Sequence, residues 1–314
     1  MKPHAFSCLT LGLALLVGAA HCQAAAAQAN AFGPPEPVAV SGLPMGAGES
    51  PLSTEEPYVS RDGRFLFFNS GEAEGNKDLH YAEATPRGWE YRGALGPDVN
   101  TRKEVEGNPT MDRAGIFYFV DGGVPAMIRT GRFSPDGRLL DLARVAAAPA
   151  RKVELFAQRV TGNMGVEVSA DGSTLYFDRA TWRLAGIRVR SILACDILLM
   201  TRTATGFAFD EARARRVLAN VNGPDIDYAE SISADDLELF FTRLAVADVE
   251  SGSVRSRIMR AVRPSRDAPF EAPEMVASIG DRDFVEGPAL TDDGRTLYYH
   301  KRVGQKFRLF RVRR

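Results

Sequence analysis

The sequence predicts an all-β fold built from five similar units, and three observations lead to this prediction. A stretch with a Glu, an Asp-containing turn and an aromatic strand occurs five times. A second strand-like stretch follows each copy. The composition is that of an ordinary globular protein, 45% hydrophobic and 25% charged, and its 29 Gly and 18 Pro suit a chain with many turns.

The repeated stretch is clearest at residues 167–180, EVSADGSTLYFDRA. The other copies, spaced by about 50 to 65 residues, are EPYVSRDGRFLFFNS, EGNPTMDRAGIFYFVD, ESISADDLELFFTR and EGPALTDDGRTLYYHK. The turn joins two strand-like halves, and Gly in three of the turns can supply a positive φ. Since one unit cannot bury its aromatic face alone, we expect neighbouring units to stack on each other.

The outer elements predict how the stack closes. A third strand-like element follows each of the first four copies, but the chain ends at Arg314 without one for the fifth. PPEPVAVSGLP, at residues 34–44, resembles the outer element APEMVASIG at 272–280 and precedes the first copy. The sequence therefore predicts a five-bladed β-propeller in which an N-terminal strand completes the last blade. Six blades are the alternative, with the extra one near RFSPDGRLLDL at 132–142.

These motifs resemble the WD40-like propeller repeats of the TolB type. The match lies in VSADGSTLYF, CDILLM, GWEYRGALGPDVN and RRVLANVN, and it extends from about Pro34 to the C-terminus. The resemblance implies a propeller of the bacterial envelope. It does not imply one function, because such repeats occur in binding, scaffolding, peptidase-associated and polysaccharide-active proteins.

The N-terminal residues 1–29 read as a secretory signal peptide. Lys2 precedes an apolar run that is too short for a membrane span, and small residues follow it. We therefore expect residues 30–314 to form a single domain without a transmembrane segment, in the periplasm or secreted. Lipidation at Cys22 is disfavoured by His21 before it. Cys195 is then the cysteine that clearly remains, so stability must come from packing.

One glutamate precedes each turn, and these five residues are the candidate ligand- or cation-binding set: Glu56, Glu106, Glu167, Glu230 and Glu286. Clustered carboxylates must bind a cation, share protons or pair with arginine, and oxygen ligands favour Ca²⁺ over zinc. The structural alternative, that each Glu accepts backbone N–H groups, is favoured by the repetition. A third hypothesis makes Glu56, Glu167 and Glu286 catalytic residues of a glycoside hydrolase.

Two insertions break the symmetry of the units. RATWRLAGIRVRSILA, at residues 179–194, carries the candidate partner-binding residues Trp182, Arg183, Arg188 and Arg190. RLAVADVESGSVRSR, at 243–257, should lie on the same face. Aromatic and arginine side chains are typical of interface hot spots, but a longer hairpin with a solvated basic face explains them equally well.

The remaining observations limit the function. A formal net charge of −1 gives no indication of a nucleic-acid or anionic-lipid partner. No zinc, serine-hydrolase or nucleotide motif is present, and Asp225, Asp227 and Glu230 lack EF-hand spacing. We therefore expect a monomeric, non-catalytic module that binds a protein or an envelope glycan and needs no cofactor, with Ca²⁺ left open. A carbohydrate-active hydrolase or lyase is the alternative.

Overall fold

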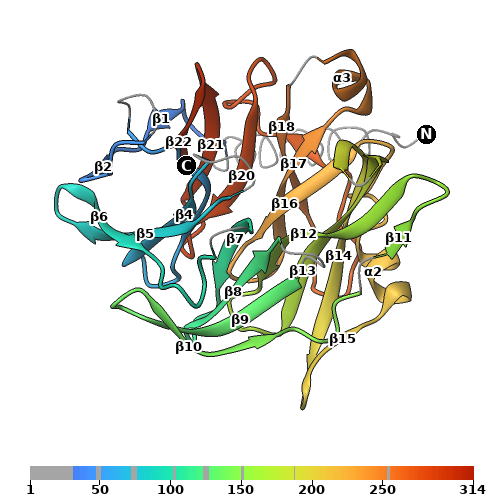
Figure 1. Cartoon of the computed structure of the whole chain (residues 1–314), viewed down its shortest axis with the longest axis horizontal. Helices are drawn as coiled ribbons and strands as arrows, with labels where there is room; N and C mark the ends of the chain where they lie inside the picture. Colours follow the sequence, from blue (N-terminus) through green and yellow to red (C-terminus); the bar gives the residue numbers. More distant parts are fainter. Residues whose placement is uncertain are drawn as a thin grey trace, which may run out of the picture.

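The computed structural model describes residues 31–46, 51–71, 76–101, 104–122, 127–149, 152–186, 188–252 and 255–314. The predicted signal peptide and Cys22 lie outside the described residues. Strands dominate the fold, with only the short helices α2 (Glu211–Val217) and α3 (Val246–Ser251) among the described residues (Figure 1). The part of the chain that the structure describes holds no helix long and apolar enough to cross a bilayer.

The strands follow one another as antiparallel meanders, each beginning with an inner strand and ending with an outer one. Each repeated stretch forms the first two strands of a meander. The first meander contains β3 (Glu55–Val59), β4 (Phe65–Asn69), β5 (Leu79–Thr85) and β6 (Gly88–Ala94), and the second contains β7 (Glu106–Met111), β8 (Ile116–Asp121), β9 (Met127–Ser134) and β10 (Arg138–Arg144).

The later meanders have the same order. The third contains β12 (Arg159–Val168), β13 (Thr174–Ala185), β14 (Arg188–Thr203) and β15 (Gly206–Phe209), with β11 (Lys152–Glu154) beside β12. The fourth contains β16 (Ile226–Ile232), β17 (Glu238–Leu244), β18 (Arg257–Val262) and β19 (Glu274–Met275), and the last contains β20 (Val285–Leu290), β21 (Thr296–Val303) and β22 (Lys306–Arg313).

The inner strands form a closed ring. Strand β3 contacts β7, β7 contacts β12, β12 contacts β16, β16 contacts β20, and β20 contacts β3 again. The meanders radiate from this ring in Figure 1, as the sheets of a β-propeller do. The segment at 132–142 supplies the β9–β10 hairpin of the second meander rather than a separate sheet.

The N-terminal segment gives the last meander its fourth strand. Strand β1 (Glu36–Pro37) pairs antiparallel with β22, and the Val38 amide donates to the Leu309 carbonyl at 2.9 Å. The chain then crosses to the first meander, where β2 (Val40–Ser41) runs parallel to β6. The predicted closing segment thus binds two neighbouring sheets, which protects the outer edges of both.

The aromatic strands explain why the units stack. Successive side chains point to opposite faces of a sheet, so Phe67 enters the cluster shared with the second meander and Phe68 the one shared with the last. Phe67 and Phe117 meet edge to face across one such interface, with ring centroids 4.9 Å apart. The corresponding clusters between the other meanders contain Tyr118 with Phe177, Tyr176 with Phe241, Phe240 with Tyr299, and Tyr298 with Phe68.

Candidate ligand-binding cavity

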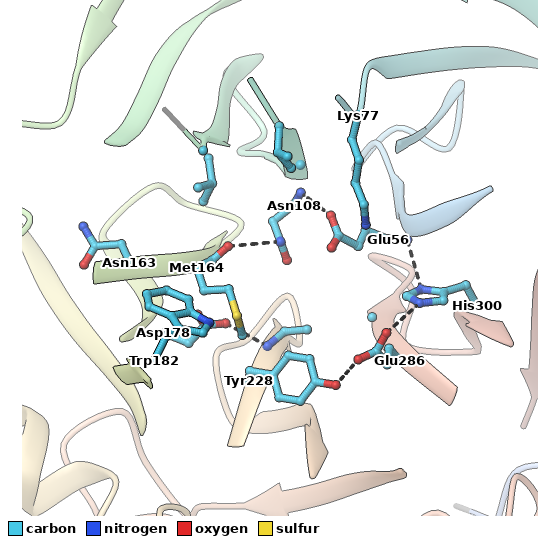
Figure 2. A pocket seen from close by; sticks show the side chains of 16 residues that line it. Glu56, Lys77, Asn108, Asn163, Met164, Asp178, Trp182, Tyr228, Glu286 and His300 are labelled. Carbon is cyan, nitrogen blue, oxygen red and sulfur yellow. Dashed lines mark hydrogen bonds and ion pairs between the residues drawn. The ribbon is translucent and has the colours of Figure 1, made fainter. Parts of the chain in front are cut away.

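A cavity of about 370 Å³ opens at one end of the ring, where the inner strands begin and the second strands end. The Asp-containing turns, which join these two strands in each meander, lie at the other end. Figure 2 shows the side chains that surround the cavity, and every meander contributes to it. Its polar and large side chains are Glu56, Lys77, Asn108, Asn163, Met164, Asp178, Trp182, Tyr228, Glu286 and His300.

A β-bulge in each inner strand shapes this wall. The pairing register shifts once in all five inner strands, as between Glu55 and Tyr58 in β3. In four of them the bulge contains a residue with positive φ, namely Glu56, Asn108, Ala229 or Gly287. This conformation costs a residue other than glycine roughly 1–2 kcal/mol, so packing around the ring must hold three of these positions in it.

Glu56 is held at the bulge by neighbours on two meanders. Its carboxylate accepts a hydrogen bond from the side-chain amide of Asn69 and another from the backbone amide of Asn108, both at 2.8 Å. A side chain at Gly107 would collide with this carboxylate, since a Cβ there would lie 2.6 Å from its Oε2. The absence of a side chain at Gly107 therefore leaves room for the charged group at the cavity wall.

Glu286 and His300 form a second hydrogen-bonded unit, which links β20, β21 and β3 (Figure 2). The Glu56 backbone N–H donates to Nδ1 of His300 at 3.0 Å, which places the proton of the neutral ring on Nε2. That nitrogen contacts Oε2 of Glu286 at 3.1 Å, and the Tyr228 hydroxyl donates to Oε1 of the same carboxylate. Glu286 is thus a fixed acceptor at the cavity wall.

Lys77 supplies the cationic group of the cavity wall. Its ammonium bonds the buried carboxylate of Glu55 and also lies in the field of Glu56 and Glu286. Burial opposes the charged form, but these three carboxylates together raise the pKa of Lys77 above its ordinary value. Lys77 is thus bonded directly to Glu55, whereas the carboxylates of Glu56 and Glu286 are bonded to other side chains of the wall.

Sequence reasoning missed several cavity residues, among them Lys77, Asn108, Tyr228, His300 and Asp178, and Asp178 is the acidic one. Asp178 directly follows the aromatic residues of β13, at the position that Asn69 and His300 occupy in β4 and β21. The Ala229 amide donates to its Oδ2 at 2.9 Å, yet burial raises its pKa to about 6. A comparison of the residues that follow the aromatic pair in each second strand could have found it, because four of the five are polar: Asn69, Val120, Asp178, Thr242 and His300.

The five predicted glutamates do not occupy equivalent positions. To compare the five glutamates, each inner strand is aligned on one residue, the partner of the central aromatic residue of the second strand. In the first meander this reference residue is Tyr58, which pairs with Phe67. The five references are Tyr58, Thr110, Glu167, Ser231 and Ala289. Glu167 is itself the reference of its strand, and the other glutamates precede theirs by one to four residues, each by a different number. Their side chains consequently reach different places.

Only Glu56 and Glu286 of the five line the cavity. Glu167 is buried in the interior of the ring, where Arg61 contacts it at 3.2 Å and the Ile232 amide donates to it. Glu106 is buried beside Thr101, and desolvation raises its pKa to about 7. Glu230 is buried next to Asp178, and burial together with that neighbour holds its pKa well above the ordinary value.

The two insertions lie on the cavity face and touch each other. Trp182 on β13 lines the cavity and belongs to a cluster with Val246 and Val249 of α3. Arg183 and Arg190 are exposed on β13 and β14, further from the ring, and the backbone of Arg188 pairs with Ala185 at the hairpin. The structure thus separates Trp182 from Arg183 and Arg190, with which it was grouped.

The described residues contain no group of three or more His, Cys, Asp or Glu side chains that could hold a metal ion. The candidate acidic loop is divided among different partners. Asp227 forms an ion pair with Arg243 at 2.6 Å, and Asp225 accepts from the Val246 amide. Glu230 points instead toward Asp178, so the three carboxylates do not converge.

Comparisons with known proteins show likeness in fold. No family model matches the sequence, and no curated protein matches it. A solved structure named as a glycoside hydrolase is similar with a TM-score of 0.56 and 10% identity, covering 91% of this chain and 92% of that one. A solved RGII complex of BT0996 has a TM-score of 0.54 at 10% identity, covering 88% of this chain and 90% of that one.

TolB from Acinetobacter baumannii is also similar, with a TM-score of 0.47 and 10% identity over 85% of this chain. This chain spans only 55% of that TolB structure. At such identities the glycoside hydrolase and the BT0996 complex show a shared fold and nothing about ligands.

Proposed function

We propose that this protein is a five-bladed β-propeller of the cell envelope that binds a glycan in its channel cavity without cleaving it. Five meanders in cyclic contact support the blade number. The predicted signal peptide and the TolB-like repeats support the location. Mass spectrometry of the secreted or periplasmic fraction tests the location, because a processed N-terminus should begin after Ala25, Ala26 or Ala29.

The observation that carries the proposal is the cavity itself. Carboxylates from different blades, Glu56 and Glu286, are held by hydrogen bonds at its wall. A sugar offers many hydroxyl donors, which such acceptors can bind, and a C–H face, which the indole of Trp182 can cover. The cavity volume of about 370 Å³ is within the range of small-ligand sites, so one or two sugar residues are the expected occupant.

Calorimetric titration with a panel of envelope oligosaccharides tests this proposal. We expect Glu286→Gln to lower the affinity about tenfold or more, because a hydrogen bond to a charged acceptor contributes about 1.5–3 kcal/mol. Glu90→Gln makes the same change on the exposed strand β6 and should leave the affinity unchanged. Equal affinities for the two variants, or no sugar binding by the unmodified protein, would contradict the proposal.

Hydrolysis of the bound glycan is the second candidate function, and one observation favours it. Three carboxyl groups from different blades, those of Glu56, Asp178 and Glu286, share the cavity, and the pKa of Asp178 is raised to about 6. Glycoside hydrolysis requires a carboxylic acid with a raised pKa and a second carboxyl group across the scissile bond. Release of new reducing ends would establish the enzyme. Asp178→Asn should then stop turnover while sugar binding remains.

A further inference from the structure

The third blade extends beyond its neighbours on the cavity face. Strand β12 has 10 residues, β13 has 12 and β14 has 16, whereas the inner strands β3 and β7 have 5 and 6. The extension consists of two hairpins, β11–β12 and β13–β14, that lie side by side. Arg159 pairs with Arg183 between them, and the Leu184 amide donates to the Gln158 carbonyl at 2.7 Å.

The ends of these hairpins carry exposed apolar side chains. Phe156 is fully exposed, Leu155 is 70% exposed, and Val189 on the neighbouring hairpin is 58% exposed. Together with Val153 they are four of the eight large exposed apolar residues among the described residues. The other four lie singly on different elements. We call Val153, Leu155, Phe156 and Val189 the apolar tip.

Cationic side chains stand directly behind the apolar tip. Arg159, Arg183 and Arg190 are exposed, and none of them forms an ion pair within the described part of the chain. The nearby acidic residue, Glu154, is paired with Lys152 at 2.9 Å. The tip region is therefore basic, although the formal net charge of the whole chain is only −1.

We propose that the apolar tip docks on an anionic lipid bilayer, with Phe156 and Leu155 entering the interface and the three arginines binding lipid phosphates. The order of the groups favours a bilayer over a protein partner. A strand rises about 3.3 Å per residue, so Arg159, three residues after Phe156, follows the tip by at most about 10 Å. Interfacial elements insert by about 5–10 Å, which brings such arginines to the depth of the phosphates. This inference is independent of the proposed glycan site.

Co-sedimentation of the full chain with vesicles tests the proposal. We expect binding to vesicles of phosphatidylcholine with phosphatidylglycerol, weaker binding at high salt, and little binding to phosphatidylcholine alone. The double variant Leu155→Ser/Phe156→Ser should lower the partition coefficient about tenfold or more. The double variant Leu140→Ser/Met275→Ser, which changes exposed apolar residues of two other blades, should bind like the unmodified protein.

All these variants share one N-terminus, so any lipid binding by that segment is common to them. Phe156→Trp gives a second readout, because its fluorescence should be quenched by brominated lipid if the tip inserts. Equal sedimentation of the two double variants, or an unquenched Phe156→Trp, would overturn the proposal. Capture of an envelope protein through Leu155 and Phe156, without vesicle binding, would replace the bilayer with a protein partner.

Discussion

The two ends of the propeller ring differ in how far their residues repeat from blade to blade. At the turn end the same contact recurs in four of the five blades: Ser60 donates to Asp62, Ser169 to Asp171, Ser233 to Asp235 and Thr291 to Asp293. At the cavity end the polar groups are not the same in every blade: the first contributes Glu56, the second Asn108 and the third Asp178. The comparison teaches that repeated residues in this fold hold the turns, whereas the unrepeated ones are the candidates for function.

The largest expected effect comes from breaking the interior contact beneath the cavity. Arg61→Ala removes the partner of buried Glu167, which leaves an unpaired charge, and should lower the free energy of unfolding by about 3–5 kcal/mol. Arg64→Ala, on the same turn but exposed beside Glu83, should change it by less than about 1 kcal/mol. Urea denaturation measures both, and equal effects would show that the interior pair is unimportant.

A smaller effect should appear as a pH dependence of stability. Burial raises the pKa of Asp178 from 3.8 to about 6, so between these values the folded chain binds a proton that the unfolded chain has released. The stability from this group is present below pH 4 and is lost as the pH rises to 7, by about 2–3 kcal/mol. Asp178→Asn lacks this loss and also removes the carboxyl group that raises the pKa of Glu230, so the variant should become more stable relative to the unmodified protein over this range.

The quantity to measure is the difference in unfolding free energy between the unmodified protein and Asp178→Asn at each pH, because His80 affects stability with the opposite sign. Burial lowers the pKa of His80 to about 4, so its contribution to stability grows as the pH rises from 4 to 6.5. This contribution is common to both proteins and cancels in the difference. Parallel curves of unfolding free energy against pH would show that Asp178 does not titrate in this range.

At the cavity end, Glu56 should respond in binding rather than in stability. Glu56→Gln keeps the size of the side chain and an oxygen acceptor, so we expect the free energy of unfolding to change by about 1 kcal/mol or less. Glycan affinity should fall about tenfold, for the reason given for Glu286. A large loss of stability without a binding defect would instead assign Glu56 to the framework and weaken the contrast between the two ends.

The smallest effect is expected at the turns. Asp62 and Asp293 each accept a side-chain hydroxyl and one backbone amide, so Asp62→Ala and Asp293→Ala should each cost about 1 kcal/mol. The two costs should agree within about 0.5 kcal/mol, because the contacts are the same. Thermal melts can compare them, and clearly different costs would show that the turns are not equivalent.

The repeated parts of the molecule could be predicted from the sequence and the unrepeated parts could not. The residues that define the aromatic strands are adjacent in the sequence. Comparison of short segments therefore predicts the hairpin around Tyr176 and the closing strand at Glu36. The placement of the glutamates depends on a bulge, and neither a bulge nor its register is visible in one sequence. Glu167 and Glu286 therefore look equivalent in the sequence, although one is buried against Arg61 and the other lines the cavity.

Strand β13 joins the two proposed contacts in one rigid element. It passes the cavity at Asp178 and Trp182 and ends at Ala185, beside the hairpin of Val189. At about 3.3 Å per residue, Trp182 lies roughly 10 Å and Asp178 roughly 23 Å from that end. With the tip seated on a bilayer, β13 would act as a spacer of fixed height. Only molecules that rise one or two nanometres from the lipid surface, or that diffuse freely above it, would then reach the binding groups.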